Sequence, residues 1–200
     1  MKKYVISIIR QFGSLGRPIA RKMSELLDIE YYDRDIVDAV AKQTCYPIEE
    51  ISTNDEMLHT GFLRMMFPLG QSSAKHQNEI FNTQRKVILE AADRESCIVV
   101  GRCSDYILEA YPNLLRIYIY APYEKRLKNC GEELHMAENQ AKRMIRGVYR
   151  ARNAYHKRYA GFAPNDMNYK DLMIDSSMLG VDGTAEYLVD LIHKKFDDKE

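Results

Sequence analysis

A glycine-containing segment with two arginines follows the first apolar run of the chain. Its sequence is RQFGSLGRP over residues 10–18. Such a segment could bind a phosphate, because backbone N–H groups and the positive end of a following helix attract anions. The strict phosphate-loop pattern is not met, since Gln11 replaces the first glycine, Arg17 the lysine and Pro18 the hydroxyl residue that would contact magnesium. The segment alone is therefore equally compatible with an ordinary glycine turn.

Further polar side chains follow the apolar runs that read as later strands. Arg102 comes directly after Gly101, and its planar guanidinium could bind a phosphate or a carboxylate. The alternative is a structural ion pair of Arg102 with Asp105 or Asp33. Asp175 ends the last apolar run and could orient a nucleotide or simply cap a turn. Because ligands of open parallel sheets bind beyond the carboxyl ends of the strands, the predicted substrate contacts are Asp33, Arg102, Asp105 and Asp175.

The most basic segment covers residues 142–158 and contains no acid. Lys142, Arg146 and Arg150 are four residues apart, a spacing at which like charges weaken a helix unless an anion neutralises them. The neutralising anion could be a nucleoside triphosphate or a nucleic acid, and the tyrosines of this segment could stack on the bases of either ligand. The alternative is a solvated face whose charges meet acids from elsewhere in the fold.

This set of cations favours phosphoryl transfer, which depends on positive charge placed around the moving phosphate. The histidines show no carboxylate or nucleophile partner at a recognisable spacing, and we interpret them as surface residues. They are His59, His76, His135, His156 and His193.

The overall composition argues against some classes of binding partner and indicates a cellular compartment. The 29 Lys+Arg residues balance the 29 Asp+Glu residues, so the overall charge argues against a nucleic-acid partner. The four cysteines form no CxxC pair, which is typical of a reduced compartment. No apolar run is long enough to span a bilayer, so we expect a cytoplasmic protein without a membrane partner. The oligomeric state is not indicated.

Apolar and β-branched runs predict five strands, at residues 4–9, 29–32, 97–100, 115–120 and 172–174. Helical spacing of apolar residues predicts helices between and after them, at 19–27, 36–41, 78–94, 106–110, from 122 onward and at 185–196. Residues 47–77 are interrupted by glycine and proline and are expected to form irregular helices. Strands that alternate with helices predict a single α/β domain with a parallel, doubly wound sheet.

In their order and spacing, these segments resemble the cytidylate kinase-like family, a branch of the nucleoside monophosphate kinases. The resemblance is carried by RQFGSLGR at 10–17, YYD at 31–33, VVGR at 99–102 with DYIL at 105–108, RIYIYAPYEKR at 116–126, and residues 171–179. It implies a P-loop NTPase-type three-layer sandwich, with a five-stranded parallel sheet and helices on both faces. It also implies an acceptor-nucleotide subdomain at about 45–77 and an arginine-rich lid at about 136–165.

The resemblance implies roles for individual residues by matching position. The loop residues would hold ATP, with Mg²⁺ as the neutralising ion and Ser14 as the candidate metal ligand; they are Gly13, Ser14, Leu15, Gly16, Arg17 and Pro18. Arg17, together with Arg150 and Arg152 of the lid, would contact the phosphates undergoing transfer. Arg102 would contact the acceptor, with CMP or dCMP as the implied acceptor, and Arg126 is a weaker candidate near the donor.

Two other functions compete with a nucleotide kinase. Family members commonly have glycine at the position of Leu15 and an acid at the position of Tyr149, and Pro18 offers no hydroxyl. These differences favour a nucleotide-binding or regulatory module that keeps the fold but has little kinase activity. The third hypothesis is a nucleic-acid-binding protein that uses residues 142–158.

Overall fold

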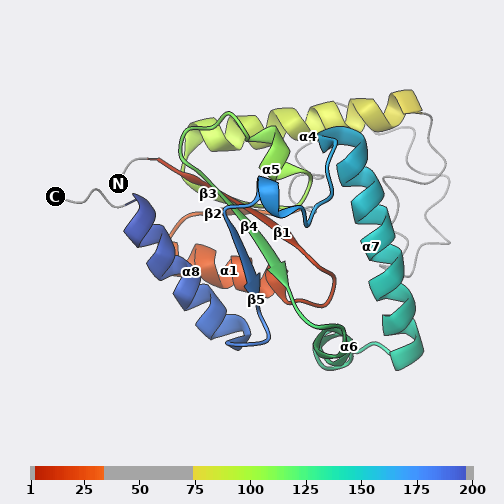
Figure 1. The fold of residues 1–200 in the computed structure, drawn as a ribbon. Coiled ribbons are helices and arrows are strands. Elements are labelled where there is room, and N and C mark those ends of the chain that lie inside the picture. Colours follow the sequence, from red (N-terminus) through yellow and green to blue (C-terminus); the bar gives the residue numbers. More distant parts are fainter. Residues whose placement is uncertain (1–2, 34–73, 197–200) are drawn as a thin grey trace, which may run out of the picture.

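A five-stranded parallel sheet forms the centre of the computed structural model, which describes residues 3–33 and 74–196 (Figure 1). The strands are β1 (Val5–Arg10), β2 (Glu30–Tyr32), β3 (Cys97–Val100), β4 (Leu114–Tyr120) and β5 (Leu172–Asp175). Their order across the sheet is β2-β3-β1-β4-β5, and neighbouring strands are parallel. The described helices are α1 (Gly16–Leu27), α4 (Ala74–Arg94), α5 (Ser104–Ile107), α6 (Tyr123–Glu132), α7 (Glu138–Ala160) and α8 (Gly180–Phe196), and a 3-10 helix, η3, covers Met167–Tyr169.

Helices cover both faces of the sheet. On one face, Ile6 of β1 and Ile117 of β4 are buried in a core that α1 and α8 complete. On the other face, Val5 of β1 and Val99 of β3 pack with Ile88 of α4. Strands that are buried on both faces need apolar residues at successive positions, which explains the uninterrupted apolar runs. The predicted three-layer α/β sandwich is confirmed.

The five strands predicted from the sequence are all present, with ends that differ by at most one residue. The helix predicted at 78–94 begins earlier, at Ala74, and the last helix begins at Gly180 rather than at residue 185. Pro122 is the N-cap of α6 rather than its first helical residue. The helix predicted at 36–41 and nearly all of the predicted acceptor subdomain lie outside the described residues.

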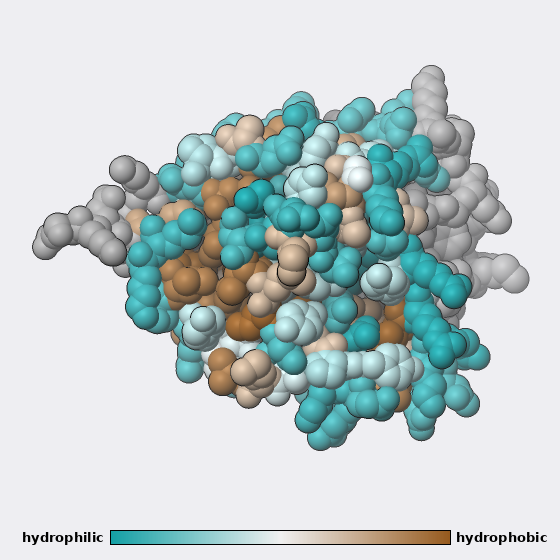
Figure 2. Space-filling view, viewed as in Figure 1, coloured by the Kyte–Doolittle hydropathy of each residue, from teal (hydrophilic) through white to brown (hydrophobic). Residues whose placement is uncertain are grey.

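Helix α7 makes up most of the predicted lid and is a single helix of 23 residues. Its first half buries Met144 and Val148 against Cys130 of α6 and Phe12 of the loop that follows β1. Figure 2 shows that the visible side of this region is mainly hydrophilic. Arg146 and Arg150 of α7 are exposed. Among the described helices, none is long and apolar enough to cross a membrane.

Candidate functional site

The loop between β1 and α1 is held in place by the neighbouring strand β4 and by the turn after β5. The backbone N–H of Gln11 donates to the Ile119 carbonyl at 3.0 Å. The Ser14 hydroxyl is fully buried and lies 3.0 Å from the Gln11 carbonyl and 3.2 Å from the Ile119 carbonyl. Ser176 donates to the Ser14 carbonyl at 2.7 Å. The conformation of the loop is therefore fixed by strands that come later in the chain.

The two glycines of this loop are required by close packing. Gly13 has a φ of +80°, and a Cβ atom there would lie 2.7 Å from the Arg126 carbonyl oxygen. A Cβ atom on Gly16 would lie 2.7 Å from the Cβ of Arg10. Leu15 occupies the left-handed region with a φ of 57° and forms the N-cap of α1, and Pro18 is exposed in the first helical turn. The loop thus presents the N-terminus of α1 at the carboxyl edge of the sheet.

Ser14→Ala tests whether the Ser14 hydroxyl is structural. Because the hydroxyl donates to buried backbone carbonyls, we expect its loss to destabilise the fold by about 1–2 kcal/mol. For ATP, the ligand that the family resemblance implies, we expect the affinity at saturating magnesium to remain unchanged. Urea denaturation and calorimetric titration of the same sample measure the two quantities. Unchanged stability with lost ATP binding would instead make Ser14 a ligand.

Arg10 and Arg102 meet where β1 and β3 end. Arg10 is the last residue of β1, and a Cβ atom on Gly101 would lie only 2.3 Å from its Nη1 atom. Arg102 follows Gly101, and its guanidinium carbon lies 5.9 Å from the centre of the Tyr155 ring on α7. Arg102 also has a positive φ, 56°, so the chain turns sharply as it leaves β3. Both guanidinium groups therefore lie at the carboxyl edge, where ligands of such sheets bind.

Arg17 brings a third guanidinium to this edge from the first turn of α1. It forms an ion pair with Asp33, which is buried at the end of β2. The Tyr31 hydroxyl donates to the same carboxylate at 3.2 Å. Asp33, predicted as a substrate contact, therefore lies at the site and orients Arg17.

The three arginines are close enough to affect one another electrostatically. Burial lowers the pKa of Arg10 to about 10, and the charges of Arg102 and Arg17 act in the same direction, whereas Tyr31 and Asp33 oppose them. A bound anion would offset both the burial of this cation and the repulsion by its neighbours. We call Arg10, Arg17 and Arg102 the arginine cluster. It is positioned to bind a phosphate.

The two predicted lid arginines lie on different sides of α7. Arg152 donates from Nη1 to the backbone carbonyl of Arg10 at 2.9 Å, which joins α7 to the arginine cluster. Arg150 is exposed. Residues two positions apart on an α-helix are rotated by about 200°, so the two side chains cannot face one ligand from the same straight helix. The structure brings Arg152 to the site and does not bring Arg150 there.

Asp105 has structural partners rather than an open carboxylate. His156 Nε2 lies 2.9 Å from one carboxylate oxygen, and Lys170 Nζ donates to the other at 2.7 Å. All three side chains are buried. The hydrogen bonds and charges of His156 and Lys170 outweigh the effect of burial and hold the pKa of Asp105 below its usual value. The Asp105 carboxylate is thus engaged by two side chains of the protein itself, and its contact with substrate stays a prediction. The expectation of a surface His156 was wrong, because His156 is buried.

The remaining candidates lie near the loop with their polar groups engaged. Asp175 Oδ1 accepts a hydrogen bond from the Ser177 N–H at 2.8 Å, so the turn-capping alternative describes its contact. Arg126 donates from Nε to the Ala121 carbonyl at 3.0 Å, and its backbone packs against Gly13. In the basic segment, Lys142 pairs with Glu138 on its own helix, whereas Arg146 and Arg150 remain exposed.

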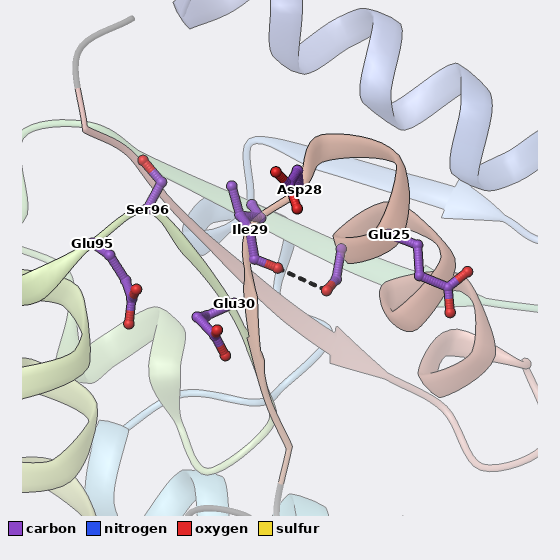
Figure 3. Close-up of a pocket in the computed structure, with 7 residues that line it drawn as sticks. Glu25, Asp28, Ile29, Glu30, Glu95 and Ser96 are labelled. Carbon is purple, nitrogen blue, oxygen red and sulfur yellow. Dashed lines mark hydrogen bonds between the residues drawn. The ribbon is translucent and has the colours of Figure 1, made fainter.

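A hollow at the opposite edge of the sheet does not suit a nucleotide. Figure 3 shows that it lies beside the N-terminal ends of β2 and β3. Four of its lining residues are acids, which would repel phosphate groups. The lining residues are Ser24, Glu25, Asp28, Ile29, Glu30, Glu95 and Ser96. The candidate site is therefore the arginine cluster and not this hollow.

A sequence model of the cytidylate kinase-like family matches residues 5–178. The chain belongs to that family. The match includes the loop after β1, the arginine cluster and all of α7. This membership, with the fold, supports transfer of a phosphoryl group in general. No curated protein matches the chain.

Solved structures with this fold include kinases. A crystal structure of an uncharacterized protein from Eubacterium ventriosum has a TM-score of 0.71 and 24% identity, and the match covers 98% of this chain and 100% of that one. Shikimate kinase from Acinetobacter baumannii, solved with shikimate, has a TM-score of 0.55 and 13% identity, covering 98% and 97%. A sugar kinase from a Janibacter species has a TM-score of 0.54 and 12% identity, covering 98% and 95%. This cytidylate kinase-like chain thus has a P-loop kinase fold.

Sequence reasoning did not include Arg10, Tyr31 or Tyr155 among the site residues of this family member. Arg10 belongs to the segment 10–18 that the sequence predicts to bind phosphate, but the sequence assigns its side chain no role of its own. The missed signal was its position, since a charged residue that ends a buried central strand lies at the ligand-binding edge.

Proposed function

We propose that this protein transfers the γ-phosphoryl group of ATP to a nucleoside monophosphate, with CMP or dCMP as the acceptor. The observation that carries the proposal is the arginine cluster, which gathers three guanidinium groups beside the N-terminus of α1. Phosphoryl transfer is accelerated mainly by positioning and by positive charge around the phosphates. Family membership supports the same class of reaction.

The proposed roles follow from the positions of the side chains. The backbone of Gly13 and Gly16 and the positive end of α1 would hold the donor phosphates. Arg17 would exchange its carboxylate partner Asp33 for a phosphate when the donor binds, because both are oxyanions that accept from its guanidinium. Arg102 would contact the acceptor phosphate from the end of β3. When bound, ATP supplies the phosphoryl group and an accompanying Mg²⁺ supplies positive charge.

A nucleotide-binding module with little kinase activity is the second candidate. It is favoured by the engaged hydroxyl of Ser14 and by Pro18, which leave the loop without an obvious metal ligand. This candidate predicts that ATP raises the melting temperature while no acceptor produces ADP.

A coupled ADP-release assay tests the proposal with ATP, magnesium and each nucleoside monophosphate in turn. We expect turnover that requires CMP or dCMP. Arg17→Ala and Arg102→Ala should each lower kcat/KM by about 100-fold or more, because each removes a cation from the transferring phosphate. Arg146→Ala removes an exposed arginine of α7 and should have little effect. Full activity in both cluster variants would contradict the assignment.

A further inference from the structure

The residues around the loop do not fit a magnesium ion held by the protein. The Ser14 hydroxyl points to two backbone carbonyls, and Pro18 has no hydroxyl. The Asp33 carboxylate is held by Arg17 and Tyr31, and Tyr31 remains its partner when Arg17 turns to a phosphate. Within residues 3–33 and 74–196, no cluster of three or more His, Cys, Asp or Glu side chains could hold a metal ion. In the described part of the site, the charge that could neutralise a phosphate comes from arginines.

Arg10 is the member of the cluster with the most constrained position. Its Cβ and Cγ atoms pack beneath Gly16 at the start of α1, and its Nη1 atom reaches Gly101 at the end of β3. Its backbone carbonyl accepts the hydrogen bond from Arg152. The side chain therefore spans from the proposed donor loop to the strand end that carries Arg102. A cation in this place would lie between donor and acceptor phosphates.

The electrostatic surroundings of Arg10 also favour the binding of an anion beside its guanidinium. Burial and the charges of Arg102 and Arg17 destabilise its charged form, and the charges of Tyr31 and Asp33 oppose them. The guanidinium cannot lose its proton at neutral pH, so the cluster keeps its charge. A metal-free polyphosphate carries its full negative charge. It would therefore compensate the positive charge of the three arginines better than a polyphosphate that a divalent ion has already partly neutralised.

We propose that Arg10 neutralises nucleotide phosphates in this protein in place of a magnesium ion held by the loop, so that the site binds metal-free ATP. The inference rests on the proposed function, because it assumes that the arginine cluster is the donor site. It concerns binding alone and leaves any metal needed for chemistry to arrive with the nucleotide.

Isothermal titration of ATP at constant ionic strength, in excess EDTA and in excess magnesium, tests this inference on the full chain. We expect metal-free ATP to bind at least as tightly as the magnesium complex. ATP that binds more than about tenfold more tightly with magnesium would overturn the inference, since tenfold corresponds to about 1.4 kcal/mol of binding free energy. ATP that fails to bind under either condition would also overturn it.

Two substitutions separate Arg10 from the rest of the cluster. In Arg10→Gln, we expect affinity for metal-free ATP to fall by about tenfold or more, and magnesium to restore part of the loss. Arg17→Gln removes an equal charge and should weaken binding by a similar factor with and without magnesium. Arg10→Lys keeps the charge and should retain magnesium-independent binding. This variant provides the test if Arg10→Gln fails to fold. An equal loss with and without magnesium in Arg10→Gln would contradict the role given to Arg10.

Failure of this inference can be told apart from failure of the proposed function. Magnesium-independent binding without turnover would remove the kinase assignment and keep the role of Arg10. Turnover together with ATP binding that requires magnesium would keep the kinase assignment and remove the role of Arg10.

Discussion

Asp105→Ala is expected to destabilise the fold by about 3–5 kcal/mol, because it removes the carboxylate that pairs with the buried Lys170 ammonium and that hydrogen-bonds to the buried His156 ring. Lys170 has a side-chain exposure of 0%, so its ammonium group would remain buried without its anion. The group also ties α5 to α7 and to the segment that enters β5. Urea denaturation of the variant and the wild-type chain measures the difference.

Asp105→Asn keeps the shape of the side chain, removes its charge and replaces one acceptor oxygen by an NH2 donor. The pKa of Asp105 is lowered in the folded state, so its ionisation stabilises the fold above its unfolded pKa of about 3.9. This contribution is lost as the pH falls through the folded pKa. We expect the difference in unfolding free energy between wild type and Asp105→Asn to shrink as the pH falls from 5 toward about 3. A difference that stays constant with pH would show that the charge does not stabilise the fold.

Under the proposed function, Gly101→Ala is expected to lower affinity for metal-free ATP by about tenfold or more and kcat/KM by about 100-fold or more, by displacing Arg10 from the arginine cluster. The added Cβ atom would lie 2.3 Å from Arg10 Nη1, far inside contact distance. Gly101 also has a φ of +81°, so the substitution strains the backbone by about 1–2 kcal/mol. Steady-state kinetics and calorimetric titration give the functional loss, and chemical denaturation gives the stability loss.

Gly161→Ala is a matched control for the backbone strain. Gly161 has a φ of +84°, and a Cβ atom there would contact no atom of the described residues within 4 Å. We expect this variant to lose stability by a similar amount while keeping its ATP affinity. Equal functional losses in the two variants would mean that strain, rather than the displaced Arg10, accounts for the effect of Gly101→Ala.

The strands and most of the helices could be predicted from the sequence because their signals are local. Buried parallel strands need unbroken apolar runs, and residues 97–100 were predicted with both ends correct. The order of strands and helices then restricted the topology to a parallel sheet. The starts of α8 and α4 were less well predicted, since their first turns carry few apolar residues.

Part of the site could also be predicted from chain order. Arg17 and Arg102 follow β1 and β3, and the carboxyl ends of parallel strands meet at one edge. The sequence could not distinguish which polar groups remain open at that edge. Asp105 and Asp175 follow strands in the same way, yet their carboxylates hydrogen-bond to the protein itself.

The sequence by itself determined the α/β class, the five strands, the loop after β1 and the presence of cations after the strand ends, because apolar periodicity and chain order are read locally. Tertiary structure alone decided which cations meet. Arg152 reaches Arg10 across 142 positions, and Asp105 and His156 meet across 51. Arg10 lies in the cluster because Gly101, on another strand, leaves room for its guanidinium. Such contacts depend on the packing of distant elements, which no local pattern of residues encodes.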